Sequence, residues 1–291
     1  MRLNTTALLA ASALALAFAA PAFADGPVAG AVAFKVGKLD LVALHDAQFS
    51  PANDGKTFGV DAGVDAVSAV LKAAGQPTDV VTLSVDALLV KDGKQIVLID
   101  TGTGGALQQS LALAKVDPAS VTDILITHSH PDHIGGLVKD GQLLFPNATI
   151  RMAAAEWTFL QGQADQAAVV KAIAAKVKPF NPGSAVAPGI TSVSIQGHTP
   201  GHVGYEIVSG KAHLLDIGDT AHSSIVSLAK PQWKMGYDND KLEGESARIA
   251  ELTKLSRSHE LIFAPHFPFP GVGHVEAQGD HFVWKPTLSA Q

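Results

Sequence analysis

The run THSHPDH at positions 127–133, directly after an apolar stretch, constrains the fold more than any other feature of the chain. In an isolated strand His128 and His130 would point to one face, because side chains two apart share a side. Pro131 fixes its own φ and disfavours helix in the residue before it, so it begins a turn that redirects the next two ligands. The run therefore predicts a buried strand followed by a site for two metal ions, with surface histidines on a polar loop as the alternative.

Three later segments also place a candidate ligand on a loop directly after an apolar expected strand. These ligands are His198, Asp219 and His266. Taken singly, they could be a turn residue, a helix N-cap and a buried core imidazole. Because loops at one edge of a sheet assembly can converge, their shared position at strand ends favours a common site with residues 127–133.

Short strands and helices alternate along the whole chain. We expect strands at 39–44, 81–90, 95–99, 124–126, 149–152, 191–195, 204–208, 212–217 and 261–264. Helices are expected at 64–74, 107–114, 153–160, 166–177 and 240–255. The segment 275–284 is expected to form a hairpin. Two strand-rich halves, each with helices, predict an α/β protein with two packed sheets covered outside by helices.

The first 24 residues have the pattern of an export signal. Arg2 is followed by the apolar stretch 7–20, and Ala22-Phe23-Ala24 is a small-x-small cleavage pattern. The apolar stretch is shorter than the ~20 residues of a spanning helix, which argues against a lasting membrane anchor. We therefore expect a periplasmic or secreted protein with one domain over residues 25–291.

The composition limits both the metal chemistry and the partners. With no cysteine in the chain, the ligands must be imidazole, carboxylate, backbone or water, which suits Zn, Mn, Fe or Co. Removal of Arg2 with the signal leaves 20 basic against 27 acidic residues, which changes the net charge from −6 to −7. This acidic balance predicts no nucleic-acid partner.

The ordered set of motifs resembles the metallo-β-lactamase superfamily, whose signature is HxHxDH followed by His, Asp and His on later loops. The resemblance extends over essentially the whole mature chain and implies an αββα sandwich with two divalent metals, zinc by family. It implies that one metal is held by His128, His130 and His198, that the other is held by Asp132, His133 and His266, and that Asp219 bridges the two.

Within the superfamily the chain is most similar to the methyl parathion hydrolase and dihydrocoumarin-type lactonase branch. The similarity lies in residues 127–137, 145–148, 197–202 and above all HFPFPGVGH at 266–274. It implies an exported hydrolase of lactones or aryl and carboxylic esters, with organophosphate triesters as a main or side activity. One alternative is a β-lactamase, which is disfavoured because binuclear β-lactamases commonly have a cysteine where Asp219 stands. The other alternative is a mononuclear iron oxygenase similar to persulfide dioxygenases.

The expected chemistry is attack by a metal-bridging hydroxide on a small ester or lactone. Asp132 and Asp219 are the catalytic carboxylates. His222 could donate a proton to the leaving group, or it could make only a structural hydrogen bond. Asp100 resembles a carboxylate that orients a ligating imidazole, with a plain turn residue as the alternative.

An apolar substrate pocket is expected beside the metals. Its candidates are Phe267, which adjoins a ligand, and Trp157, Phe49, Phe58 and Phe269. The sequence leaves the oligomeric state open between a monomer and a homodimer.

Overall fold

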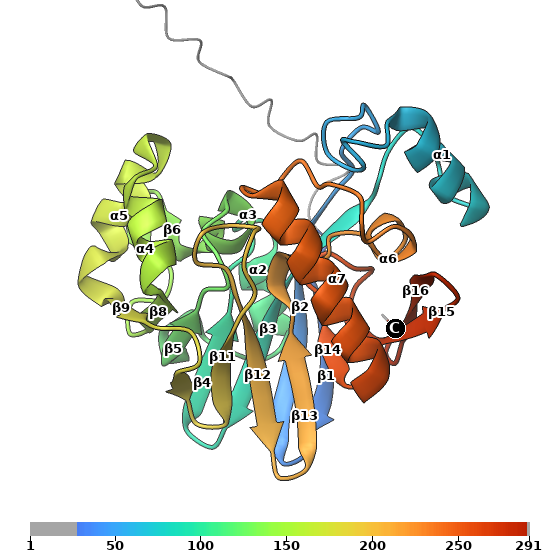
Figure 1. Ribbon diagram of the computed structural model, residues 1–291. Helices are drawn as coiled ribbons and strands as arrows, with labels where there is room; N and C mark the ends of the chain where they lie inside the picture. The colour runs from blue at the N-terminus through green and yellow to red at the C-terminus, as the bar shows by residue number, and fades with distance from the viewer. Residues whose placement is uncertain (1–27, 290–291) are drawn as a thin grey trace, which may run out of the picture.

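The computed structural model describes residues 28–289, so the export signal at residues 1–24 lies outside the described residues. Among the described helices, none combines the length and the apolar character needed to cross a membrane. Two seven-stranded mixed sheets pack against each other in the centre of the molecule (Figure 1).

The first sheet has the strand order β1-β2-β3-β4-β5-β8-β9. The pairs β4·β5, β5·β8 and β8·β9 are parallel, and the pairs from β1 to β4 are antiparallel. Its strands are β1 (Gly30–Val36), β2 (Leu39–Phe49), β3 (Leu83–Asp92), β4 (Gln95–Ile99), β5 (Asp123–Leu125), β8 (Thr149–Ala153) and β9 (Val177–Phe180).

The second sheet runs in sequence order from β10 to β16 and contains one parallel pair, β13·β14. Its strands are β10 (Ala185–Ala187), β11 (Ile190–Ser194), β12 (Val203–Ser209), β13 (Ala212–Asp216), β14 (Leu261–Phe263), β15 (Val272–Gln278) and β16 (His281–Pro286). The expected hairpin is confirmed, because β15 pairs with β16 from Gly273↔Pro286 to Gln278↔His281. A further short hairpin, β6 (Val138–Lys139) and β7 (Gln142–Leu143), stands apart from both sheets.

Helices cover the outer faces of both sheets. The helices are α1 (Val64–Ala73), α2 (Leu107–Leu113), α3 (Pro131–Ile134), α4 (Ala154–Gln161), α5 (Ala167–Ile173), α6 (Val226–Ala229) and α7 (Lys241–Ser258). On the first sheet, Leu111 of α2, Leu160 of α4 and Ile173 of α5 join one apolar cluster with the strands. On the second sheet, Leu252 and Leu255 of α7 pack against the strands (Figure 1).

The space between the sheets is filled from both sides. Leu41, Leu88 and Leu125 of the first sheet meet Tyr205 and Phe263 of the second in one buried cluster. Burial of apolar area from two facing sheets stabilises the sandwich and fixes which strand ends lie together. The predicted αββα architecture is therefore confirmed.

The helix expected at 166–177 is wrong in its second half. Helix α5 ends at Ile173, a 3-10 turn follows at Ala174–Lys176, and Val177 begins strand β9. Strand β9 pairs in parallel with β8 along Ile150↔Val177 to Ala153↔Phe180. Pairing with a sheet edge thus determines the structure of a segment whose local composition favours helix.

Candidate metal centre

The THSHPDH run turns away from the sheet as soon as β5 ends. Strand β5 stops at Leu125, His130 is extended at ψ 152°, and Pro131 is the first residue of helix α3. Proline is well tolerated there because the first helical N–H has no partner within the helix. The expected turn at Pro131 is confirmed, and it places Asp132 and His133 on a helical turn while His128 and His130 remain on the preceding loop.

The first group of ligand atoms comes from this loop and the loop after β11. His198 Nε2 lies 3.1 Å from His128 Nε2 and 2.9 Å from His130 Nδ1, and the latter two atoms are 3.0 Å apart. Asp219 Oδ2, after β13, lies 3.5 Å from His128 Nε2 and 3.3 Å from His198 Nε2. Three imidazole nitrogens and one carboxylate oxygen therefore surround one point.

The second group lies on the other side of the Asp219 carboxylate. Its Oδ1 atom is 3.2 Å from His133 Nε2 and 3.2 Å from His266 Nε2. Asp132 Oδ2 completes the group, 3.6 Å from His266 Nε2 and 4.0 Å from His133 Nε2. Asp219 thus lies between the two groups: Oδ2 faces His128 and His198, Oδ1 faces His133, and His266 Nε2 is 3.2 Å from both oxygens.

Hydrogen bonds on the side of each ring away from the centre determine which nitrogen of three imidazoles carries the proton. His133 Nδ1 donates to Asp100 Oδ2 at 2.7 Å, His198 Nδ1 to Asp238 Oδ1 at 3.0 Å, and His266 Nδ1 to the Ser84 carbonyl at 2.7 Å. Because carboxylates and carbonyls only accept, the proton is on Nδ1 and the Nε2 lone pair faces the centre.

Lone pairs that face one another need a positive charge between them. His133 Nε2 is only 3.4 Å from His266 Nε2, and Asp219 Oδ1 is buried with no hydrogen-bond partner among residues 28–289. Burial, assisted by neighbouring histidines, lowers the pKa of His130 to about 3, so protons on the rings do not supply that charge at every position. The donor set therefore fits two divalent cations.

Asp100 is held in a conformation that suits its contact with His133. Its backbone is left-handed at φ 57°, a region that Asp tolerates better than most residues. Its carboxylate accepts hydrogen bonds from Thr127 N and Thr127 Oγ1 as well as from His133 Nδ1. Asp100 therefore orients a ligand ring and anchors the start of the motif loop.

Glu156 of α4 is a buried carboxylate that the sequence analysis did not single out. Its Oε1 accepts from Ser129 N at 2.7 Å and from Ser129 Oγ at 2.5 Å. Its Oε2 accepts from Thr199 Oγ1 at 2.7 Å and from Gly201 N at 3.0 Å. Glu156 therefore ties the loop of His128 and His130 to the loop of His198, and we call these four contacts the Glu156 clamp.

Gly201 is required for the Glu156 clamp. A Cβ atom at position 201 would lie 2.1 Å from the backbone nitrogen of Glu156. Only glycine permits the loop after β11 to approach α4 so closely.

Asp238 is a second supporting carboxylate missed in the sequence. It accepts from His198 Nδ1, and its other oxygen lies 3.3 Å from Arg248 Nη1 of α7. Burial would raise the pKa of Asp238, but His198 and Arg248 keep it below its usual value, so the carboxylate stays ionised. The pair fixes the His198 ring against the helix that covers the second sheet.

The comparisons with known proteins agree with this geometry. The model of the metallo-beta-lactamase superfamily matches residues 80–241, more than half of the chain. This chain belongs to the metallo-beta-lactamase superfamily. Among curated proteins, it is 23% identical over 240 residues to a probable metallo-hydrolase of Mycobacterium bovis, covering 65% of this chain and 76% of that protein. It is also 24% identical over 131 residues to an uncharacterized Bacillus subtilis protein, YobT, where the match covers 42% of this chain and only 56% of YobT.

Two solved structures of the superfamily resemble the whole described fold. The dizinc quorum-quenching lactonase AidC is 27% identical, with a TM-score of 0.85 over 90% of this chain and 99% of AidC. The hydrolase AbOPH is 29% identical, with a TM-score of 0.83 over 91% of this chain and 99% of AbOPH.

His222 lies against the metal centre of this superfamily member without any hydrogen bond. Both ring nitrogens are buried and lack a partner among the described residues, although Nε2 is 3.1 Å from Asp219 Oδ2. The ring stacks on His266 with centroids 5.5 Å apart and lies 5.7 Å from the Tyr237 ring. Burial lowers the pKa of His222 despite the Asp219 charge, which favours a neutral imidazole there.

Of the five aromatic candidates for a substrate pocket, only Phe49 and Phe58 share a buried cluster. Phe267 is fully buried and packs edge-on against Trp284 at 5.0 Å, within the cluster under α7. Trp157 packs on the outer cluster of the first sheet, and Phe58 belongs to the cluster beneath α1. Phe49 contacts His266 edge-on at 6.0 Å, and Phe269 lines a separate cavity.

Proposed function

We propose that the protein is an exported, binuclear metal-dependent hydrolase that cleaves lactones and carboxylic or aryl esters. The observation that carries the proposal is the Asp219 carboxylate, which lies between the two groups of ligand atoms and is within 3.5 Å of imidazole nitrogens of both. A bridging carboxylate between two cations is suited to activating water rather than to storing metal. Similarity to the dizinc lactonase AidC over 90% of the chain supports the substrate class.

Two divalent ions, zinc by family, would lower the pKa of a shared water and polarise the substrate carbonyl when bound. His128, His130 and His198 would hold one ion, Asp132, His133 and His266 the other, and Asp219 would bridge them. Asp100, Asp238 and the Ser84 carbonyl keep the imidazole lone pairs aimed at the centre. This preorganisation spares the site from reorienting its ligands during the reaction.

Three side chains of the site have candidate catalytic roles, one of them being the bridging carboxylate of Asp219. Asp132 is the most exposed of the ligand carboxylates, with 26% of its side chain accessible, so it can meet substrate from the open side. His222 has an unsatisfied nitrogen beside Asp219 and can give a hydrogen bond or a proton to the leaving alkoxide. We therefore assign Asp132, Asp219 and His222 as the catalytic side chains.

The absence of cysteine from the sequence favours this substrate class over β-lactams. Every ligand in both groups is an imidazole or a carboxylate, and Asp219 occupies the place where binuclear β-lactamases commonly carry cysteine. Organophosphate triesters form the second candidate class, because residues 266–274 resemble the methyl parathion hydrolase branch.

A substrate panel with metal analysis tests the proposal. The purified protein is assayed on N-acyl homoserine lactones, aryl esters, phosphotriesters and β-lactams, and metal per chain is counted by mass spectrometry. We expect two metal equivalents and turnover of lactones or esters. One iron per chain, or metal-loaded protein inactive on the whole panel, would overturn it. Export is checked by the N-terminal sequence of the cell-envelope fraction, which we expect to begin near Asp25.

A further inference from the structure

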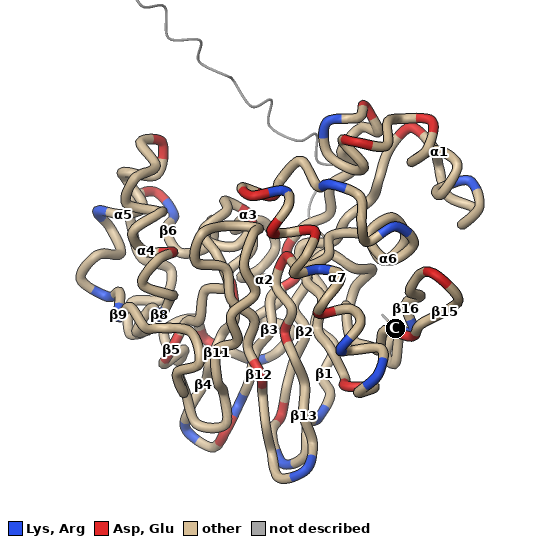
Figure 2. The backbone as a smooth tube through the Cα atoms, viewed as in Figure 1, with Lys and Arg blue, Asp and Glu red and all other residues tan. Residues whose placement is uncertain are grey.

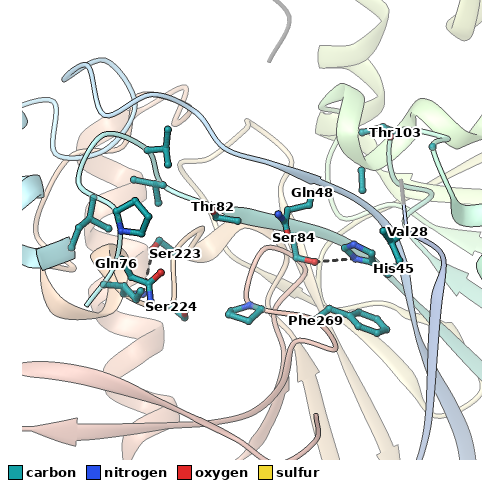
Figure 3. Close-up of a pocket in the computed structure, with 18 residues that line it drawn as sticks. Val28, His45, Gln48, Gln76, Thr82, Ser84, Thr103, Ser223, Ser224 and Phe269 are labelled. Carbon is teal, nitrogen blue, oxygen red and sulfur yellow. Dashed lines mark hydrogen bonds between the residues drawn. The ribbon is translucent and has the colours of Figure 1, made fainter. Parts of the chain in front are cut away.

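A cavity of about 850 Å³ lies beside the metal centre without including any of its ligands. It is bounded by the ends of β2 and β3, the segment after α1, the start of α6 and the loop at Pro268 and Phe269 (Figure 3). Its volume is within the roughly 300–1,000 Å³ of small-molecule sites. The apolar part of its wall includes Ala47, Leu71 and Ile225.

The backbone of Ser84 forms the partition between this cavity and the metal ligand His266. Ser84 N donates to the His266 carbonyl at 3.2 Å, and the Ser84 carbonyl accepts from His266 Nδ1 at 2.7 Å. The side chain of Ser84, by contrast, lines the cavity. At this wall the backbone of β3 therefore lies between the cavity and the His266 ring.

An imidazole with a defined proton lines one end of the cavity. His45 Nδ1 lies 2.6 Å from Asp86 Oδ1, and Ser84 Oγ donates to the same oxygen at 2.8 Å. Figure 3 shows His45 and Ser84 next to each other, apart from Gln76, Ser223 and Ser224 at the other end. Because Asp86 accepts the Nδ1 proton, His45 Nε2 carries a lone pair and can accept a hydrogen bond from a ligand.

The Asp86 carboxylate lies behind the cavity wall and is buried without full hydrogen bonding. It is 2% exposed, and its Oδ2 has no hydrogen-bond partner in the described part of the chain. Burial raises the pKa of Asp86 to about 6, even though His45 and Ser84 lower it. An ionised, half-satisfied carboxylate behind a cavity-lining imidazole is the arrangement that orients a hydrogen-bond acceptor.

The lining excludes strongly charged ligands. Among the described residues that line the cavity there is no Lys, Arg, Asp or Glu, so a carboxylate or ammonium ligand would be desolvated without a full counter-charge. The Phe269 ring lies 5.1 Å from the His45 ring at 46°, which provides an apolar surface beside the acceptor. The matching ligand is uncharged, has an alkyl or aryl body and carries one hydroxyl donor.

We propose that this cavity is a second small-molecule site, distinct from the metal centre, that binds a neutral phenol or alcohol through its hydroxyl to His45 Nε2. The binding of such a ligand does not depend on the proposed hydrolytic function, because the contacts involve none of the metal ligands.

Calorimetric titration of the metal-loaded protein with 4-propylphenol and 4-propylanisole tests the proposal. The anisole has the same body but no donor, so the phenol should bind about two- to tenfold more tightly, the effect of one net hydrogen bond. In His45→Phe the two ligands should bind equally. Thr82→Trp, which places an indole at the exposed cavity wall, should abolish binding of both. The matched control Thr158→Trp, on an exposed face of α4, should bind like the wild type.

The Asp219→Ala variant distinguishes this site from the metal centre. Phenol binding that persists in this variant supports a separate cavity even if the protein hydrolyses no lactone or ester. Loss of phenol binding there would place the ligand at the metals and overturn the proposal. Equal affinity of the wild type for phenol and anisole, unchanged binding by Thr82→Trp, or no binding at all would also overturn it.

Discussion

At the scale of single residues, Asp219 is the side chain that contacts both groups of imidazoles in the site. It follows β13 on a 3-10 turn, and its backbone N–H donates to His202 Nε2 at 3.0 Å. That bond fixes the turn, so the carboxylate lies between the two groups of imidazoles. Positive charge on those groups holds the pKa of Asp219 well below its usual value, against the effect of burial. The carboxylate is therefore ionised and available to two cations at once.

Replacing Asp219 with Asn should remove at least one metal equivalent and lower kcat/KM by about 100-fold or more, because the amide cannot bridge two cations. Metal per chain and lactone or ester hydrolysis are measured together. Asp165→Asn, at an exposed position between α4 and α5, is the matched control and should behave like the wild type. Full activity with two metals in Asp219→Asn would refute the bridging role.

His222→Gln addresses the only imidazole beside the metal groups that has no described hydrogen bond. If His222 assists the leaving group, kcat should fall by about 100-fold, the lower range for a general acid, while both metals remain. Loss of a metal equivalent would instead make His222 a ligand or a support. His213→Gln, at an exposed position on β13, is the control.

The convergence of the candidate ligands could be predicted from sequence, whereas the residues that support them could not. His128, His130 and His133 sit within one short run, so type and spacing alone identify them. Glu156 and Asp238 act on partners 27 to 45 residues away and have no spacing pattern around them. A single glutamate in a short helical segment looks like a solvent-exposed residue until the fold buries it.

At the scale of elements, the Glu156 clamp shows how helix α4 contributes to a site built otherwise from loops. Glu156 lies in the first turn of α4, directly after β8, and β8 is the parallel neighbour of β5. Register between these strands therefore places a carboxylate under the loop that follows β5. The helix positions the metal loops without supplying a ligand.

Glu156→Gln should weaken metal binding by about 10- to 100-fold, because an amide nitrogen would face donors where a carboxylate oxygen now accepts. Metal affinity is measured by competition with a chelator, and circular dichroism confirms that the fold persists. Glu276→Gln, at an exposed position on β15, should leave affinity unchanged. Equal metal affinity in both variants would show that the loops hold themselves in place.

Element prediction succeeded where local pattern and tertiary environment agree. The strand expected at 95–99 has those bounds, since Gln95–Ile99 is apolar and lies between two neighbours in the sheet. Strand β1 was missed. Its residues Gly30–Val36 are half-exposed, and their extended structure comes from pairing with β2. Edge strands depend more on such partners than on their own composition.

At the scale of the whole molecule, two halves of the chain contribute separate halves of the site. The first sheet supplies His128, His130, Asp132 and His133 after β5, and the second supplies the remaining ligands after β11, β13 and β14. Basic and acidic residues are interspersed over helices and loops outside this centre (Figure 2). Metal binding at the proposed site would therefore join the two sheets at one edge and stabilise the whole sandwich.

Metal removal should lower the free energy of unfolding by about 3 kcal/mol or more when free metal exceeds its dissociation constant a hundredfold. The loss should also depend on pH. In the metal-free chain, burial opposes protonation of His198, but Asp219 and Asp238 raise its pKa to about 9. Because the pKa of His198 is higher in the folded chain than in the unfolded chain, its protonation stabilises the folded state. This contribution to the free energy of unfolding is complete below the unfolded pKa of about 6.5 and is lost as pH rises through about 9.

Chelator-treated protein should therefore unfold at lower urea concentration at pH 9 than at pH 6.5. Metal-loaded protein should show a smaller difference between the two pH values, because bound cations replace the proton on the ring. Urea titrations of both forms at the two pH values measure the effect. Metal-free protein that is equally or more stable at pH 9 would show that protonation of His198 does not compensate for the missing cations.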